Sequence, residues 1–250
     1  MSLLEYSLKS SLIAQGITTL IGASGLFINL AEKDKILNTL LKLETLVQIV
    51  EASFYILVTK YLPRLDLNSI SKLRYADWVL TTPMMLLSTV VFMIYNTTKP
   101  ASLMEILKDN KKPLIRITVC NLCMLLCGLL GEYGIIDKFT STILGFAFFG
   151  CVFNTIYKEY TKQNKKNLVL FWFTCIVWAL YGLVYLFNSL NKNIAYNILD
   201  VIAKNFYGLF ILYEIYLKRN EKYVQFFFSL SSFFSSNKLI FLELSRVLQL

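Results

Sequence analysis

The chain has 250 residues, of which 56% are hydrophobic and 16% charged, and its mean hydropathy is +0.56. Soluble domains carry roughly a quarter charged residues, so this composition indicates a membrane protein. The net charge of +9 does not point to a nucleic-acid partner, because the basic residues lie between apolar segments. The absence of histidine excludes imidazole metal ligation, and the five cysteines all lie in apolar segments, where no disulfide framework or zinc site is expected.

Seven apolar segments follow one another, each close to the roughly 20 residues that a membrane-spanning helix needs. They cover residues 6–30, 38–62, 73–95, 113–130, 135–157, 167–187 and 195–217. The predicted fold class is an all-α membrane protein, a seven-transmembrane-helix bundle that occupies residues 1–222. The first segment lacks the features of a cleaved signal peptide and is predicted to stay as a span. The tail, 223–250, is predicted to be an interfacial helix or an added segment.

The connections between the segments differ in charge, and this difference predicts the orientation of the bundle. Those after the first, third and fifth segments, with the start of the tail, hold Lys33, Lys35, Lys99, Lys108, Lys111, Lys112, Lys158, Lys162, Lys165, Lys166, Lys218, Arg219 and Lys222. The other connections hold only Arg64, Lys72, Lys138 and Lys192. Because lysine and arginine favour the cytoplasmic side, we expect the N-terminus outside and the C-terminus inside.

Ionisable residues inside the apolar segments are the strongest functional signal. Each costs roughly 2.5 to 3.5 kcal/mol at mid-membrane, so each must be paired, hydrated or functional. Asp200 and Lys204 are four apart and therefore share one face of the seventh helix. Taken alone, they are equally compatible with a structural ion pair and with a reactive amine, because a neutral lysine amine can condense with an aldehyde. In the third segment, Arg74 and Asp77 precede Trp78.

Two motifs identify a family. The stretch Arg74-Tyr75-Ala76-Asp77-Trp78-Val79-Leu80-Thr81-Thr82-Pro83 resembles the third-helix signature of microbial (type 1) rhodopsins, and Leu199-Asp200-Val201-Ile202-Ala203-Lys204 resembles their retinal-lysine signature. The chain as a whole is most similar to the viral channelrhodopsins of large algal DNA viruses. This resemblance implies that Lys204 carries all-trans retinal as a protonated Schiff base, with Asp77 and Asp200 as counterions.

The resemblance also implies a retinal pocket. Its residues would be Trp78, Thr81, Thr82, Met124, Gly128, Trp178, Tyr181 and Tyr185. Thr81 is one turn from Asp77, where its hydroxyl could bond that carboxylate or the Schiff base. By itself, an aromatic stripe such as Trp178, Tyr181 and Tyr185 is more often ordinary packing than a cofactor site.

The activity of the protein is predicted from positions where this sequence differs from that of proton-pumping relatives. Proton-pumping relatives place a carboxylate eleven residues after the counterion on the third helix, and here that position is Ser88, which cannot act as a proton reservoir. The segment 188–197 holds no acidic residue for proton release. Polar stripes run instead along three helices, and carboxylates in a hydrated seam select cations. For Ser11 or Gln15 taken individually, hydrogen bonding between helices is the better account.

The sequence therefore predicts a light-gated cation channel, not an enzyme, in a multi-pass membrane location. Its predicted pathway consists of Ser11, Glu44, Glu51, Arg74, Ser88, Asn197 and Asn205. The predicted partners are the lipid bilayer and monovalent cations or protons. The sequence is also compatible with an oligomer of this chain. A slow outward light-driven proton pump and a sensor that signals to a transducer protein are the alternatives.

Overall fold

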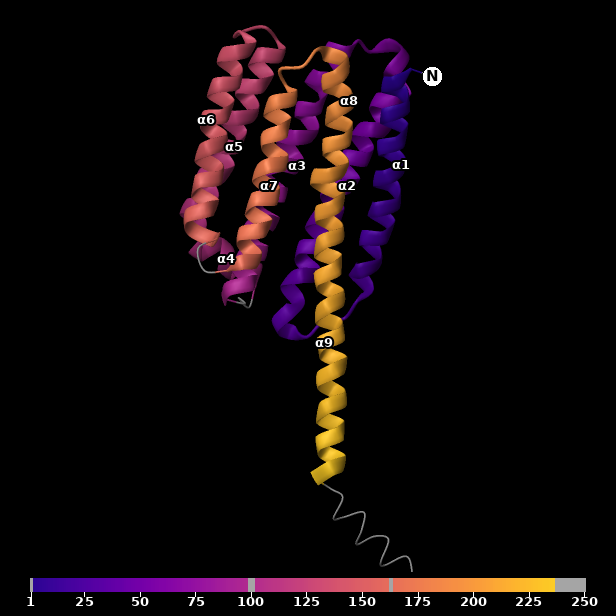
Figure 1. The fold of residues 1–250 in the computed structure, drawn as a ribbon, viewed down its shortest axis with the longest axis vertical. Coiled ribbons are helices and arrows are strands. Elements are labelled where there is room, and N and C mark those ends of the chain that lie inside the picture. Colours follow the sequence, from indigo (N-terminus) through magenta and orange to yellow (C-terminus); the bar gives the residue numbers. More distant parts are fainter. Residues whose placement is uncertain (1, 99–101, 162–163, 237–250) are drawn as a thin grey trace, which may run out of the picture.

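The structure is a computed structural model that describes residues 2–98, 102–161 and 164–236, with side chains as far as residue 221. Within these ranges every element is helical. Seven long helices lie side by side in one bundle (Figure 1). The predicted fold class is therefore confirmed.

The first six long helices match the predicted segments to within about six residues. They are α1 (Leu3–Ser24), α2 (Lys35–Tyr61), α3 (Leu67–Thr98), α5 (Lys111–Glu132), α6 (Lys138–Ile156) and α7 (Lys165–Val184). Short helical segments adjoin or connect them: η1 (Gly25–Phe27), η2 (Glu32–Asp34), η3 (Leu62–Arg64), α4 (Leu103–Asp109) and η4 (Tyr157–Thr161).

The seventh helix is continuous and has three parts. These are α8 (Ser189–Asp200), the π-helical segment η5 (Val201–Asn205) and α9 (Phe206–Ser236). A π-helical turn inside an α-helix is rare and is often found at functional sites. Residues 223–236 of the predicted tail continue α9, and residues 237–250 lie outside the described residues. The interfacial placement of the tail stays a prediction.

Two ends of the bundle can be distinguished in Figure 1. The N-terminal end holds the start of α1, the α2–α3 connection and the α5–α6 turn. The tail end holds the α1–α2 connection and α4, and α9 projects beyond it. At the N-terminal end, Asp137 caps α6, since its side chain accepts hydrogen bonds from the backbone N–H groups of Phe139 and Thr140. Hydrogen bonds from Thr140 and Phe139 hold the pKa of the Asp137 carboxyl below its ordinary value.

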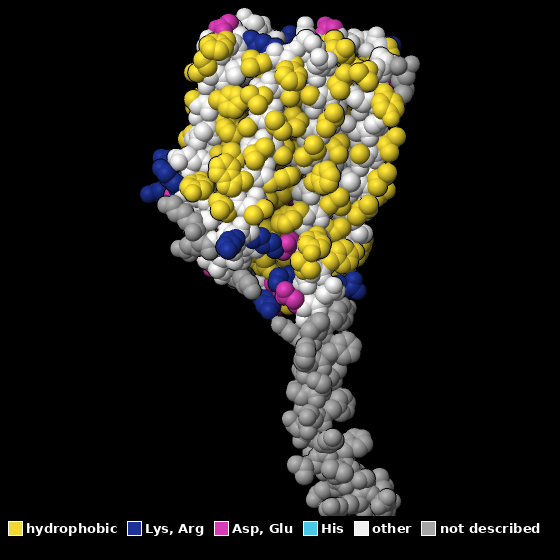
Figure 2. Space-filling model, in the orientation of Figure 1, with side chains coloured by type: hydrophobic (Ala, Val, Ile, Leu, Met, Phe, Trp, Pro, Cys, Tyr) yellow, Lys and Arg dark blue, Asp and Glu magenta, His cyan; other side chains and the backbone are white. Residues whose placement is uncertain are grey.

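The outer surface of the bundle is apolar. Hydrophobic side chains cover the face seen in Figure 2, and lysine and arginine gather toward the two ends. Five helices of the described part are long and apolar enough to cross a membrane by length and composition alone: α1 with η1, α3, α5, α6 with η4, and α7. The other two positions in the bundle belong to α2 and the seventh helix, which bury several charged side chains. Those side chains lower the mean hydropathy of helices that are nevertheless part of the bundle.

The helix neighbours determine where the site forms. α3 contacts α2, α5, α7 and α8, so it lies at the centre of the bundle, while α1 contacts α2, α8 and α9. In Figure 1, α5 and α6 form one side of the bundle and α1 the other. Residues of α3 thus face an aromatic region toward α5–α7 and a polar region toward α1, α2 and the seventh helix.

Candidate functional site

Lys204 lies in the π-helical segment at the centre of the bundle, surrounded by three carboxylates. Its Nζ is 2.5 Å from Asp77 Oδ2, 3.5 Å from Glu51 Oε1 and 3.8 Å from Asp200 Oδ1. All four side chains are buried. The structure thus brings together the predicted amine and both predicted counterions. It also adds Glu51, which the sequence had placed only in the pathway.

Arg74 binds one of these carboxylates, that of Asp200, from the N-terminal side. Its Nη1 is 3.0 Å from Asp200 Oδ2, and the guanidinium also donates to Asn193 and Asn197. Tyr55 and Tyr181 donate hydrogen bonds of 2.8 and 2.9 Å to the two Asp200 oxygens. Asp200 is thus held by three donors, whereas Asp77 Oδ1 has no hydrogen-bond partner among the described residues. Of the two predicted counterions, Asp77 is therefore the one that is freer to respond to Lys204.

The formal charge of this cluster is negative. Lys204 and Arg74 supply two positive charges, and Asp77, Asp200 and Glu51 supply three negative ones. In a low-dielectric interior such an excess attracts a further cation or a proton.

Thr81 does not make the predicted contact. Its hydroxyl donates to the backbone carbonyl of Asp77 at 3.0 Å rather than to the Asp77 carboxylate or to Lys204. The reason is helical geometry, because a threonine inside a helix readily bonds the carbonyl four residues earlier. Thr82 likewise donates to the carbonyl of Trp78 at 2.7 Å, and it accepts a hydrogen bond from Asn121 of α5.

An aromatic cavity adjoins Lys204 on the side of α5, α6 and α7. Seven of the predicted pocket residues line it with Lys204: Trp78, Thr82, Met124, Gly128, Trp178, Tyr181 and Tyr185. The lining also contains residues that the sequence analysis missed, among them Tyr75, Ser141, Thr142, Phe146, Phe149 and Tyr196. The cavity has a volume of about 120 Å³, enough for several water molecules.

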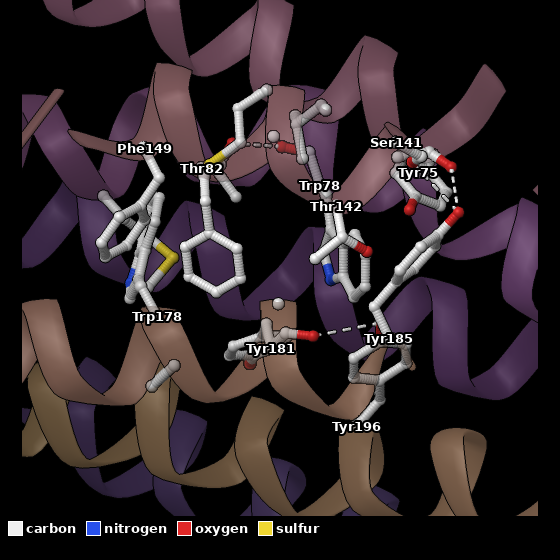
Figure 3. Close-up of a pocket in the computed structure, with 18 of the residues that line it drawn as sticks. Tyr75, Trp78, Thr82, Ser141, Thr142, Phe149, Trp178, Tyr181, Tyr185 and Tyr196 are labelled. Carbon is white, nitrogen blue, oxygen red and sulfur yellow. Dashed lines mark hydrogen bonds between the residues drawn. The ribbon is translucent and has the colours of Figure 1, made fainter. Parts of the chain in front are cut away.

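The cavity is an aromatic slot with a single charged side chain in its described lining, that of Lys204. Trp78 and Tyr181 contact each other edge to face, with ring centroids 5.6 Å apart. Figure 3 shows Phe149 and Trp178 toward one end and Ser141, Tyr75 and Tyr185 toward the other. Gly182 allows the Phe146 ring to pack closely in the cavity wall, since a Cβ at position 182 would lie 2.7 Å from that ring. The lining therefore suits a flat, apolar molecule that meets the lysine amine.

A second buried region lies on the opposite side of Lys204, and we call it the polar seam. It consists of Ser11 and Gln15 of α1, Glu44, Gln48 and Glu51 of α2, and Asn197 and Asn205 of the seventh helix, all of them buried. Ser11 donates to the backbone carbonyl of Asn197 at 3.0 Å, and Asn205 donates to Thr18. Five of the seven residues retain polar atoms without a hydrogen-bond partner among the described residues: Gln15, Glu44, Gln48, Glu51 and Asn205.

Two glycines face Gln48 in the polar seam. A Cβ at Gly208 of α9 would overlap the Gln48 amide nitrogen, and one at Gly22 of α1 would lie 3.8 Å from Gln48 Oε1. Toward the tail end, Ser88 of α3 lies 3.5 Å from the hydroxyl of Tyr207 and faces Glu44. The predicted pathway residues Ser11, Glu44, Glu51, Asn197 and Asn205 thus lie along one seam. Arg74 and Ser88 lie on α3 beside it, toward opposite ends.

The comparisons with known proteins agree with this geometry. The model of the "Bacteriorhodopsin-like protein" family matches residues 7–217. The crystal structure of viral rhodopsin OLPVRII is similar, with 32% identity and a TM-score of 0.77 over 84% of this chain and 96% of that one. A search of curated proteins gives no match.

Two further solved structures share the fold at lower identity. Blue light-absorbing proteorhodopsin from Med12 is 19% identical, with a TM-score of 0.71 over 88% of this chain and 100% of that one. Bromide-bound halorhodopsin from Halobacterium salinarum is 18% identical, with a TM-score of 0.66 over 88% and 95%. At these identities the likeness shows the fold alone.

The fold and the site define a multi-pass membrane protein in which a buried lysine joins an aromatic cavity to a cluster of carboxylates. The chain belongs to the bacteriorhodopsin-like family of microbial rhodopsins. Membership implies a retinal chromophore and the general role of a photoreceptor or ion transporter. The cavity fits such a chromophore, because its lining is aromatic and Lys204 contributes an amine to it.

Proposed function

We propose that this protein is a light-gated cation channel whose pathway follows the polar seam. The observation that carries the proposal is a set of buried polar atoms that have no hydrogen-bond partner among the described residues, in Gln15, Glu44, Gln48, Glu51 and Asn205. Of these residues, Glu51 also forms an ion pair with Lys204, at 3.5 Å. A buried polar group without a partner is costly, by about 1 to 3 kcal/mol, and buried polar groups are normally satisfied by protein or water. Several such groups in a row between the same helices indicate a hydrated path rather than a packing fault.

All-trans retinal, bound to Lys204, would supply light absorption and a change of shape on isomerisation. Trp78, Trp178 and Tyr181 would enclose it, since they line the cavity next to Lys204. Asp77 Oδ2 is the nearest described acceptor for a proton that leaves Lys204 Nζ, at 2.5 Å. Neutralising that pair changes the charge facing Glu51, whose carboxylate is 3.5 Å from the same nitrogen. Glu51 thereby couples the cavity to the seam.

The charges along the path support cation selectivity. Glu44 and Glu51 are seven residues apart on α2, so they lie on one face about 10 Å from each other along the helix axis. Both are fully buried. Carboxylates in a hydrated pore attract cations and repel anions. We place the tail end of the bundle in the cytoplasm, because most of the lysines and arginines lie in its connections.

An outward proton pump is the second candidate, and one contact favours it. Glu44 faces Ser88, so a carboxyl group does lie near the position where pumping relatives carry a proton donor, although it comes from α2. A pump would use Glu44 to return a proton to Lys204. A channel would use the same carboxylate to attract cations.

Photocurrents from Glu44→Gln and Glu51→Gln test the pathway. We expect both variants to carry smaller currents with reduced preference for cations. Glu32→Gln is the matched control, because it removes one exposed carboxylate that pairs with Lys35 in the α1–α2 connection. Unchanged amplitude and selectivity in both seam variants would remove the seam from the pathway.

A further inference from the structure

A polar hollow lies at the tail end of the bundle, between α3, α7 and α9. It is lined by Tyr95, Asn96, Lys166, Glu214, Leu217, Lys218 and Glu221. Its volume is about 240 Å³. The hollow is large enough for a hydrated ion.

The hollow lies on the same faces of α3 and α9 as the Ser88–Tyr207 contact. Tyr95 follows Ser88 by seven residues on α3, and Glu214 follows Tyr207 by seven residues on α9. Seven residues are two helical turns, so each pair shares a face and is separated by about 10 Å along the axis. Ser88 and Tyr207 contact each other, and Tyr95 and Glu214 both line the hollow. The hollow is therefore the next polar site after the Ser88–Tyr207 contact.

Glu214 presents a buried carboxylate to this hollow, and a lysine covers it. Lys166 Nζ of α7 is 2.5 Å from Glu214 Oε2. The Glu214 side chain is 4% exposed, whereas that of Lys166 is 44% exposed. The ammonium also lies 5.6 Å from the ring centroid of Phe92, which stands on α3 between Ser88 and Tyr95. The lysine is the mobile member of the pair, because only its side chain reaches solvent.

The backbone next to Lys166 is fixed. Asn167 is fully buried and donates hydrogen bonds of 2.8 and 2.9 Å to the carbonyls of Met93 and Tyr160. Asn96 in turn donates to Asn167 Oδ1 at 2.9 Å. These bonds hold the start of α7 against α3 and η4, so a rotation of the Lys166 side chain can uncover Glu214 without movement of the helix.

We propose that Glu214 is a monovalent cation site at the tail-end mouth of the path and that the Lys166 ammonium, a tethered cation, occupies it when the path is closed. The role in conduction rests on the proposed channel, but the cation site itself does not. A lysine ammonium and a sodium or potassium ion carry the same charge and compete for one carboxylate. Lys166 thus blocks the site by occupying it rather than by closing a lid.

Thermal unfolding of the purified protein tests the site without any photocurrent. The probe is NaCl, compared with N-methyl-D-glucamine chloride at equal ionic strength. In Lys166→Gln we expect sodium to raise the unfolding temperature, because a ligand that binds only the folded state stabilises it. The unchanged protein and Lys166→Gln/Glu214→Gln should show no difference between the two salts. Lys165→Gln is the matched control, since it removes the same charge from the exposed neighbouring residue.

Photocurrents distinguish this proposal from a simpler alternative, in which the Lys166–Glu214 ion pair only holds α7 and α9 together and thereby latches the path closed. If Lys166 competes with cations for Glu214, Lys166→Gln increases the current of cations entering from the tail end several-fold, and Glu214→Gln decreases it. An ion pair that only latches the helices predicts an increase in both variants. An increase in Glu214→Gln would therefore overturn the proposal, and this result can be obtained even if Lys166→Gln fails to accumulate. Equal behaviour of Lys166→Gln and Lys165→Gln in both assays would overturn it as well. A sodium effect in Lys166→Gln without photocurrent in the unchanged protein would support the site and refute the channel.

Discussion

Arg74 offers the clearest test of the charge arrangement around Lys204. Its guanidinium is fully buried and lies 3.0 Å from Asp200 Oδ2. Two unit charges at 3.0 Å attract by about 5 kcal/mol at an effective dielectric constant of about 20. Removal of one member of a buried pair destabilises proteins by roughly 3 to 5 kcal/mol, because the other charge is left without compensation. We therefore expect Arg74→Met to lower the free energy of unfolding by about 3 to 5 kcal/mol.

The assay is unfolding of the purified protein in increasing fractions of sodium dodecyl sulfate, followed by tryptophan fluorescence. Arg74→Met/Asp200→Asn should recover part of the loss, since the unpaired carboxylate is gone. Arg74→Lys should recover less than the full stability, because lysine cannot bond Asp200, Asn193 and Asn197 together with one planar group. The reasoning is wrong if Arg74→Met costs less than about 1 kcal/mol, the range of an exposed pair, or if the double variant is no more stable than the single one.

Three further predictions concern the cavity and the helix ends. Lys204→Ala should stay colourless with all-trans retinal, and a visible absorption band in that variant would refute the attachment site. Gly182→Ala should slow colour formation because its Cβ would displace the Phe146 ring, whereas Gly150→Ala should not, since Gly150 is outside the described cavity lining and a Cβ there meets nothing within 4 Å. Asp137→Ala should lower the unfolding temperature and Asp137→Asn, which keeps a capping oxygen, much less so. Because the folded-state pKa of Asp137 is lowered, its contribution should be present at neutral pH and be lost as the pH falls through that lowered pKa.

The sequence predicted the helices and the central charges because both depend on local patterns. Apolar segments of spanning length predict helices directly. Asp200 and Lys204 share a face at a spacing of four, and Arg74 precedes Asp77 in a long motif. The stripe Glu44, Gln48 and Glu51 follows from helical periodicity, and the structure buries all three residues.

The missed features depend on how the helices pack. Glu51 reaches Lys204 because the polar face of α2 packs toward the seventh helix, and no pattern within α2 specifies which helix that face meets. Phe146 and Phe149 were missed since α6 is apolar on all sides, so its cavity face has no amphipathic signal. The Lys166–Glu214 pair joins segments that are distant in the chain, and no pattern in the sequence indicated the π-helical turn at Val201–Asn205.

The current–voltage relation of the photocurrent tests the central claim most directly. With a sodium gradient across a voltage-clamped membrane, passive flow through the polar seam should reverse sign near the sodium equilibrium potential and shift with the gradient. A photocurrent that keeps one direction at all voltages, and that ignores the sodium gradient, would contradict the channel and favour the outward proton pump.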